Sequence, residues 1–424
     1  MLKRGFCSTR ALRIARRVSC LEPRVHTPNP APYQCAYASS RPSPRVNHRK
    51  PGTLPPKARL VDRAQGTEKS DSITSGDYSA TEEGLFPRFL LESAKASGEV
   101  KYHPEDAYRF LKAYSDQLGA QKGQIKPESV QKLCNDHGIE IRDLTTLAQI
   151  LLRGGKKPTF SLARSLLQSG STLGDPSATF FVVRQALKSS AATLKRIGIS
   201  LQHLSTLAMD GDPEALYLLG MVDQEELKFP SALNNFEKAE KALDNVDGDT
   251  RMLQSELFVA LGRLRLKMGE RVKAETSLRR ATALDDGTAF HHLAGLQPPL
   301  SSERYTYLLK GASAGITESA HELGQFYLRS IDQKHNNLGE EIQDGIFLNT
   351  EEDDLKSMAI EWLTVSATGG YTQSQLDLAT LLISERRFQE AMEWIEKAQE
   401  DPSVATAISD LKEEYELKRR SAAG

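Results

Sequence analysis

Two stretches of this sequence carry residue types that could bind a phosphate group or a metal ion. The turn at 153–159 is basic and contains two glycines, but it lacks the G-x-x-x-x-G-K-[ST] spacing of a phosphate loop and no buried strand precedes it. His321 and Glu322 begin like the H-E-x-x-H zinc helix, but Gln325 stands where the second histidine is required. We therefore expect a solvated turn at the first stretch and a structural histidine at the second.

The remaining reactive side chains are also poorly placed for catalysis. His291 and His292 are adjacent, so on a helix they point apart and cannot share a ligand. Cys134 follows Leu133 in an apolar helical stretch, where a buried thiol is expected. The acidic run at 351–354 predicts a solvated loop, because its spacing does not match a calcium site. The sequence therefore predicts no catalytic, cofactor-binding or metal-binding residues, and a protein that is not an enzyme.

The elements that position these residues are helices almost throughout. From about Phe86 onward, apolar residues recur at helical spacing, as in Ala107, Phe110, Leu111 and Tyr114. Alternation of the strand type is absent over any useful length. Pro and Gly fall between the periodic stretches, which indicates short helices separated by turns. The turns are expected at 154–155, 174–176, 211–213 and 298–299.

Three segments of the chain share one pattern of small and large residues without gaps. They begin at Ser200, Arg304 and Ala359 and have a turn glycine in common, at Gly211, Gly315 and Gly370. The segments end on Leu219-Gly220, Leu323-Gly324 and Leu378-Ala379. A shifted phase adds Leu261-Gly262, which is followed by Ala274, Leu278 and Ala281. A small residue at such a place lets two helix backbones approach, while large apolar residues fill the flanking grooves.

This pattern resembles the Sel1-like repeat, a relative of the tetratricopeptide repeat. The resemblance covers residues 200–402 well and 142–199 only in part. It implies an all-α fold, an α-solenoid of antiparallel helix pairs, because no single pair buries its own apolar side. We expect a helical, partly repeat-like region at 84–199, repeats at 200–402, and a capping helix and tail at 403–424, with the helix itself at 411–420.

The N-terminal part of the chain differs sharply in charge from the rest. Residues 1–60 contain thirteen Lys and Arg and one acidic residue, Glu22, which leaves 42 basic against 55 acidic residues for 61–424. Phe6, Ile14 and Val18 can share one side of an arginine-rich helix, a pattern typical of a mitochondrial transit peptide. A basic tail that binds nucleic acid or anionic lipid is the alternative. Residues 61–83 are expected to be a disordered linker, like the basic leader before them.

Cysteines and apolar runs limit the class of protein further. Three of the four cysteines lie in the leader, and Cys134 alone remains in the body, which excludes a disulfide framework or a zinc cluster there. No run of about 18 apolar residues occurs, so a membrane-spanning helix is not expected. We predict a protein of the mitochondrial matrix, with peripheral association to the inner membrane as one variant.

In relatives of the tetratricopeptide repeat, the first helix of each pair lines a concave surface that holds a protein partner. Projected onto this chain, the predicted partner-binding groove comprises Tyr217, Met221, Gln224, Val259, Arg263, Leu266, His321, Gln325, Gln373, Leu376, Thr380 and Ile383. Chaperone-binding members clamp a peptide carboxylate with Lys and Asn, whereas this chain has Val259 and Arg263 there. The mixed apolar and polar set suits an amphipathic helix or an extended segment.

The sequence thus predicts a non-catalytic mitochondrial scaffold or assembly factor that binds a protein client. It is similar to fungal-type respiratory-chain assembly factors, which extends the expectation to cytochrome oxidase biogenesis on fold and compartment alone. A mitochondrial RNA-processing or translation factor is one alternative, which the net acidic body disfavours because phosphate contacts need a basic groove. An enzyme with its site in 84–199 is another.

Overall fold

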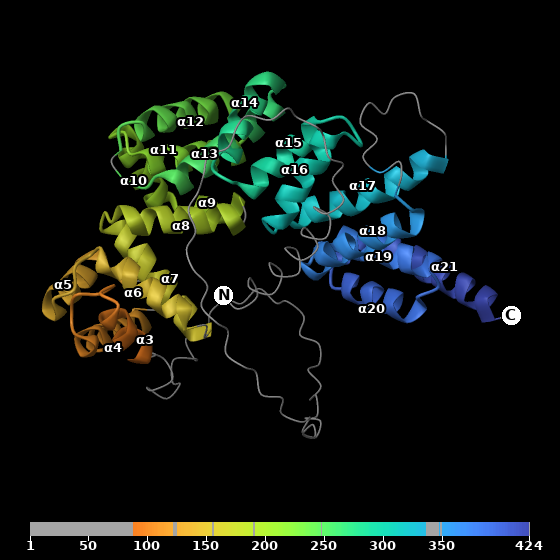
Figure 1. The fold of residues 1–424 in the computed structure, drawn as a ribbon. Coiled ribbons are helices and arrows are strands. Elements are labelled where there is room, and N and C mark those ends of the chain that lie inside the picture. Colours follow the sequence, from red (N-terminus) through yellow and green to blue (C-terminus); the bar gives the residue numbers. More distant parts are fainter. Residues whose placement is uncertain are drawn as a thin grey trace, which may run out of the picture.

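The structure, a computed structural model, describes residues 88–121, 125–154, 157–189, 191–246, 248–335, 347 and 350–423. Figure 1 shows helices following one another along a curved array, from α3–α7 at one end to α18–α21 at the other. No strand occurs in these ranges. The predicted all-α class is therefore confirmed, whereas the predicted leader at 1–60 and linker at 61–83 lie outside the described residues.

The N-terminal third of the array consists of seven helices that precede the repeats. They are α3 (Arg88–Ala96), α4 (Pro104–Ala120), α5 (Pro127–His137), α6 (Asp143–Arg153), α7 (Lys157–Thr172), α8 (Pro176–Ser189) and α9 (Ala191–Arg196). Helices α6 and α7 pack side by side as a pair, and α8 packs against α7, α10 and α11. This packing joins the N-terminal helices to the repeats without a break.

The repeat region continues the array with helices of 10 to 19 residues. They are α10 (Gly198–Met209), α11 (Pro213–Glu225), α12 (Phe229–Leu243), α13 (Arg251–Lys267), α14 (Arg271–Thr282), α15 (Gly287–Leu296), α16 (Ser302–Ser313), α17 (Thr317–His335), α18 (Glu352–Thr368), α19 (Thr372–Ser384) and α20 (Phe388–Ala398). The main pairs are α11 with α12, α13 with α14, α15 with α16, α17 with α18, and α19 with α20. A short 3-10 turn, η2 (Pro402–Val404), leads to α21 (Ala405–Ala423), which covers α19 and α20.

The turns at 174–176, 211–213 and 298–299 lie where Pro and Gly predicted them, whereas Gly155 of the predicted turn at 154–155 lies outside the described residues. Gly211, Gly315 and Gly370 have φ of +87°, +92° and +90°, a left-handed conformation that glycine adopts without steric cost. Asp212 then caps α11, because its carboxylate accepts a hydrogen bond from the backbone N–H of Ala215 at 2.8 Å. At this turn a glycine followed by a capping aspartate therefore ends α10 and begins α11.

The buried core runs along the array in three clusters that follow one another. The first extends from Leu91 to Leu293 and the second from Ala294 to Trp362. The third begins at Leu363 and ends at Tyr415 on α21. Because Trp362 and Leu363 are neighbours on α18, this helix contributes to two clusters. Each pair thus buries its apolar side against the pairs next to it, as expected of a repeat array.

Two local expectations need correction. The acidic run at 351–354 is not a loop, because α18 begins at Glu352 and Glu351 is its N-cap. Negative charge in the first turn of a helix is stabilised by the helix dipole, which explains why the run starts the helix. The terminal helix α21 spans Ala405–Ala423 and is longer than the expected 411–420.

Candidate binding surface on the first helices

The first helices of the main pairs are α11, α13, α15, α17 and α19. Three of these helices have a glycine where they cross the second helix of their pair, namely Gly220 on α11, Gly262 on α13 and Gly324 on α17. A Cβ atom at Gly220 would lie 2.5 Å from a ring carbon of Phe236, and at Gly324 it would lie 2.7 Å from Leu363 Cγ. These glycines therefore permit the close helix crossing that the sequence pattern predicted.

The residue after each crossing position occupies a corresponding place on successive helices. These residues are Met221, Arg263, Gly295, Gln325 and Thr380, the third by its position after the buried Ala294. We define the first-helix surface by these residues and, on α11, α13, α17 and α19, by those one turn before and after them: Tyr217, Glu225, Val259, Lys267, His321, Arg329, Leu376 and Ser384. Gln224, Leu266, Leu328, Gln373 and Ile383 flank it. All twelve residues of the predicted groove belong to this surface or its flank.

The structure exposes only part of the predicted groove. Arg263, Gln373 and Thr380 are exposed, and Met221, Leu266, His321 and Gln325 are half-buried. Tyr217, Gln224, Val259 and Leu376 are 6–8 % exposed, so they present little more than an edge. Ile383 has no exposed surface and packs in the third core cluster. The side chains that could contact a partner are therefore concentrated on the seven exposed or half-buried positions.

One arginine ties the N-terminal helices to the first two repeats. Arg184 on α8 forms ion pairs with Glu214 on α11 at 3.0 Å and with Glu256 on α13 at 2.8 Å. Its guanidinium also lies 5.6 Å from the ring centroid of Tyr217. The two carboxylates at the start of these helices are therefore already neutralised by the protein. Sequence analysis missed Arg184, because an ion pair across 72 residues leaves no local signal.

At the other end of the array, Asp377 on α19 organises a second polar cluster. Its carboxylate accepts hydrogen bonds from Gln325 at 2.5 Å and from Gln373 at 2.7 Å. His321 Nε2 lies 3.7 Å from the same carboxylate, and His321 Nδ1 lies 2.9 Å from Ser374 Oγ. Burial lowers the pKa of His321, although the carboxylates nearby oppose that shift.

Ser374, His321 and Asp377 are the residue types of a hydrolase triad. Ser374 has no exposed surface, and its hydroxyl lies 2.7 Å from that of Ser366. A nucleophile must reach a substrate, so this arrangement is a structural link between α17 and α19. The same kind of link recurs between α15 and α17, where His291 Nδ1 lies 3.1 Å from Ser319 Oγ. These histidines are structural, as the sequence indicated.

Charge in the middle of the surface comes from Arg263 on α13. Its positive charge opposes the rise in the pKa of Tyr217 and contributes to the lowered pKa of His292. Burial, the neighbouring His291 and Arg263 together lower the pKa of His292 to about 4. His292 is therefore neutral at neutral pH, and Arg263 supplies the positive charge at this place.

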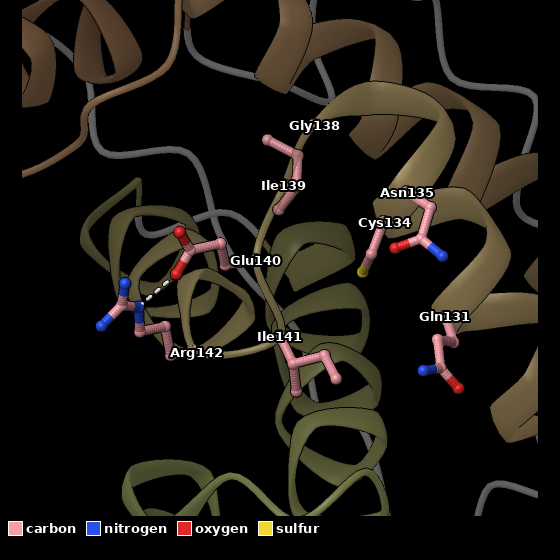
Figure 2. Close-up of a pocket in the computed structure, with 8 residues that line it drawn as sticks. All are labelled: Gln131, Cys134, Asn135, Gly138, Ile139, Glu140, Ile141 and Arg142. Atoms are coloured by element: carbon pink, nitrogen blue, oxygen red, sulfur yellow. Dashed lines mark hydrogen bonds and ion pairs between the residues drawn. The ribbon is translucent and has the colours of Figure 1, made fainter.

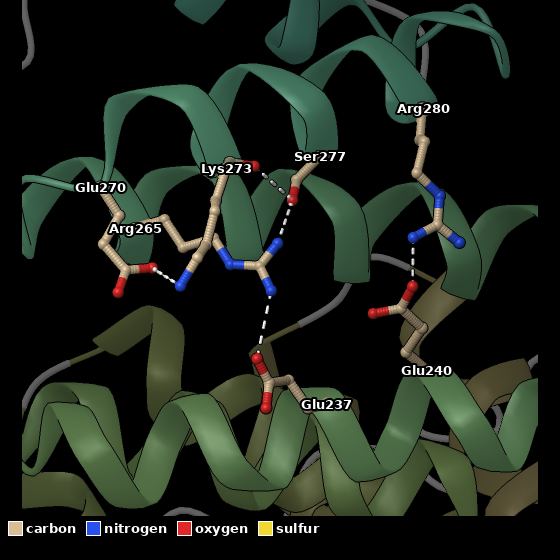
Figure 3. A network of polar contacts seen from close by, with 7 residues as sticks. All are labelled: Glu237, Glu240, Arg265, Glu270, Lys273, Ser277 and Arg280. Atoms are coloured by element: carbon tan, nitrogen blue, oxygen red, sulfur yellow. Dashed lines mark hydrogen bonds and ion pairs between the residues drawn. The ribbon is translucent and has the colours of Figure 1, made fainter.

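A separate network of polar contacts joins α12, α13 and α14. Figure 3 shows Arg265 between Ser277 on α14 and Glu237 on α12, at 2.6 Å and 3.2 Å. Arg280 on α14 pairs with Glu240 on α12 and lies 3.9 Å from the ring centroid of Phe258. These cations have carboxylate partners within the protein, so the network stabilises the packing of adjacent repeats.

A hollow near Cys134 is the candidate for an enzyme site in the N-terminal helices. Gln131, Asn135 and the segment 138–142 line it together with Cys134 (Figure 2). Burial raises the pKa of the Cys134 thiol to about 11, and a protonated thiol is a weak nucleophile. Glu140 and Arg142 form an exposed ion pair with each other. The hollow thus lacks an activated nucleophile.

Two further tests bear on ligands and membranes. Within the ranges that the structure describes, no group of three or more His, Cys, Asp and Glu side chains is placed to hold a metal ion. In the same ranges no helix combines the length and the apolar character needed to cross a bilayer.

Several solved structures are similar to this chain, among them the following three. A Sel1 repeat protein from Oxalobacter formigenes is 17% identical, with a TM-score of 0.41, over 82% of this chain and 98% of that one. A monomeric mutant of IFIT1 with m7Gppp-AAAA is 16% identical, with a TM-score of 0.41, over 78% and 77% of the chains. The protective antigen c5321 of uropathogenic Escherichia coli, which displays an SLR fold, is 15% identical, with a TM-score of 0.28, over 73% and 79%.

None of these three similarities is strong enough to place the chain in a family or to give it a function. No family model matches the sequence, and no curated protein is significantly similar to it.

Proposed function

We propose that this protein is a non-catalytic scaffold of the mitochondrial matrix that holds a protein client on its first-helix surface. The observation that carries the proposal is the run of consecutive first helices whose corresponding positions are exposed or half-buried and chemically mixed. Half-buried Met221 and Leu266 can contact apolar side chains, while Arg263 and Thr380 offer polar contacts. Such a surface suits an amphipathic helix or an extended segment.

A non-catalytic role is supported by the side chains that could have done chemistry. Ser374 beside His321 is fully buried, and the thiol of Cys134 is held protonated. Helical repeat folds of this kind generally mediate contacts between proteins, and their extended surfaces supply the binding area.

The direct test is affinity purification from isolated mitochondria, followed by mass spectrometry. The wild-type chain should recover one or a few proteins, and Met221→Glu with Leu266→Glu should lose them, because charge replaces two apolar contacts. Lys238→Ala, an exposed change on the second helix α12, is the matched control and should recover the same proteins. Crosslinking that recovers RNA and no protein would instead favour the RNA-binding alternative.

The compartment rests on the leader, whose arginine-rich and acid-poor composition supports import into mitochondria. Residues 1–60 fused to a fluorescent reporter should direct it to mitochondria. A diffuse cytosolic signal would remove this part of the proposal without affecting the binding surface.

Within this proposal the client is a component of the respiratory chain, and cytochrome oxidase biogenesis is the process served. Fold and compartment are the support, which is a matter of analogy. A deletion strain should lose assembled cytochrome oxidase, measured by native gel electrophoresis and by respiration. Normal levels of every respiratory complex would contradict this assignment and leave the scaffold proposal standing.

A further inference from the structure

Positive charge is concentrated on the later turns of the first helices, although the body of the chain is acidic. Arg263 and Lys267 on α13 and Arg329 on α17 are exposed. Within the described residues, none of the three forms an ion pair; the ammonium of Lys267 lies 6.0 Å from the ring centroid of Phe229. We call these three residues the basic row. Glu225 on α11 is the one acidic residue at the corresponding positions of the first helices.

Several carboxylates near the basic row are occupied or lie at the other end of the helices, whereas Glu225 on α11 and Asp332 on α17 are exposed on the later turns. Arg184 neutralises Glu214 and Glu256, and neutral amides from two glutamines bind Asp377. Glu318 is exposed and accepts a hydrogen bond from Thr317, but it is eleven residues from Arg329, about 16 Å along the helix. On α13 and α17 the exposed cations Arg263, Lys267 and Arg329 outnumber the one exposed carboxylate of their later turns, Asp332.

The helix between the two ends of the basic row has a glycine at the corresponding position. Gly295 on α15 is exposed, and a Cβ atom built there would meet no atom within 4 Å. Helix α15 lies between α13 and α17 in the array and ends at Leu296. The helix between Arg263 and Arg329 thus contributes no side chain at the corresponding position, which leaves room for an incoming chain.

Apolar side chains border the same row. Leu266 on α13 and Leu328 on α17 are half-buried, and each precedes a member of the basic row in the sequence. A segment lying on the row would therefore meet alternating charged and apolar surface. A polyanion bound through its phosphates requires a denser array of cations than three on two helices.

We propose that the client of this scaffold binds through internal Asp or Glu side chains that flank apolar residues, and that Arg263, Lys267 and Arg329 receive these carboxylates. The inference rests on the proposed function and specifies the chemistry of its partner. Exposed ion pairs contribute modestly to affinity but strongly to the choice of partner. The basic row thereby selects an acidic segment, although residues 61–424 contain more acidic than basic side chains.

The test is a selection from random 16-residue peptides displayed within a phage coat protein, so that no free carboxyl terminus is present. The full chain is the bait, and the net charge of the enriched peptides is the readout. Enrichment of Asp and Glu next to apolar residues is expected. Enrichment of basic or uncharged peptides, or the absence of any enrichment, would overturn the inference.

Variants then locate the contact by fluorescence anisotropy with the most enriched peptide. Arg263→Ala and Arg329→Ala should each weaken binding about two- to fivefold, because each removes one exposed charge pair. Gly295→Glu should weaken it similarly, since it puts a carboxylate in the open space without a steric conflict. Lys238→Ala should bind like the wild type. Equal binding by all four variants would place the peptide elsewhere and overturn the inference.

Two further measurements separate this inference from the proposed function. Oligouridine of 20 nucleotides should not compete with the enriched peptide, and competition by it would favour RNA and overturn the inference. Recovery of the same client by the Arg263→Ala and Arg329→Ala double variant would refute the basic row and leave the scaffold proposal intact. Failure of the wild-type chain to recover any protein would refute the proposed function itself.

Discussion

Replacing Gly262 by alanine tests the close crossing of α13 and α14. A Cβ atom at this position would lie 2.6 Å from Leu278 Cγ, 2.7 Å from Leu278 Cδ2 and 3.4 Å from the carbonyl oxygen of Ala274. The first two distances are shorter than carbon atoms tolerate, so Leu278 or the whole of α14 must move. Leu278 is fully buried, which leaves its side chain no free volume to move into.

Two opposing effects set the size of the change. Overpacking a core costs about 1–3 kcal/mol, whereas alanine in place of glycine inside a helix gains about 1 kcal/mol. We therefore expect Gly262→Ala to lower the free energy of unfolding by about 1 kcal/mol. Gly295→Ala meets no atom within 4 Å, so it should raise that free energy by about 0.5–1 kcal/mol.

A double-mutant cycle with Leu278→Ala isolates the contact. Leu278→Ala alone should cost about 2–5 kcal/mol through loss of buried apolar surface. In that background Gly262→Ala no longer clashes, so it should stabilise rather than destabilise. Urea unfolding followed by circular dichroism gives the global value. Hydrogen exchange of α13 and α14 gives the local one, since a repeat array can unfold in parts. Additive effects of the two substitutions would refute the proposed crossing.

Three further predictions concern other parts of the molecule. Phe347→Ala should destabilise the α16–α17 region by about 3 kcal/mol in urea unfolding, because the Phe347 ring packs 5.2–5.3 Å from the rings of Tyr327 and Tyr305; an unchanged midpoint would contradict this. The pKa of His292 is lowered to about 4, so below the usual pKa of about 6.5 the unfolded chain takes up a proton that the folded chain does not. Stability should then fall between pH 6.5 and 4 by on the order of 1 kcal/mol after solvent screening, and His292→Gln should remove that part of the pH dependence of the urea midpoint. Leu227 has φ of +60° and is exposed, so Leu227→Gly should stabilise the chain by about 1 kcal/mol; a lower melting temperature would show that the Leu227 side chain makes a necessary contact.

The repeat register could be predicted because it depends on short-range features of the sequence. Glycine at 220, 262 and 324 marks three helix crossings, and Gly211, Gly315 and Gly370 mark three turns. Each of these features is visible within one pair of helices, and a shift of one residue would destroy the agreement among segments. This is why the all-α array and the pairing of its helices could be predicted without a structure.

The binding surface was less predictable, because exposure depends on residues far apart in the sequence. Ile383 aligns with Gln224 and Leu266 in the repeat, yet it is buried within the third core cluster, which includes residues of α21. Arg184 can form its two ion pairs only because α8 lies close to both α11 and α13. The periodicity of the sequence does not indicate which helices lie close together. The acidic run at 351–354 predicts a loop but begins a helix, because the same charges favour both a solvated turn and a helix start.

The bonds between successive first helices differ in kind, and this has a mechanical consequence. Arg184 holds carboxylates on α11 and α13 at once, so a change in the angle between those helices must stretch an ion pair. Farther along, α15 and α17 are joined by the hydrogen bond between His291 and Ser319, which resists such a change less than the two ion pairs of Arg184 do. The array should therefore be stiff near α11 and more compliant near α15. A force applied to its two ends would bend it first at the shortest of its first helices.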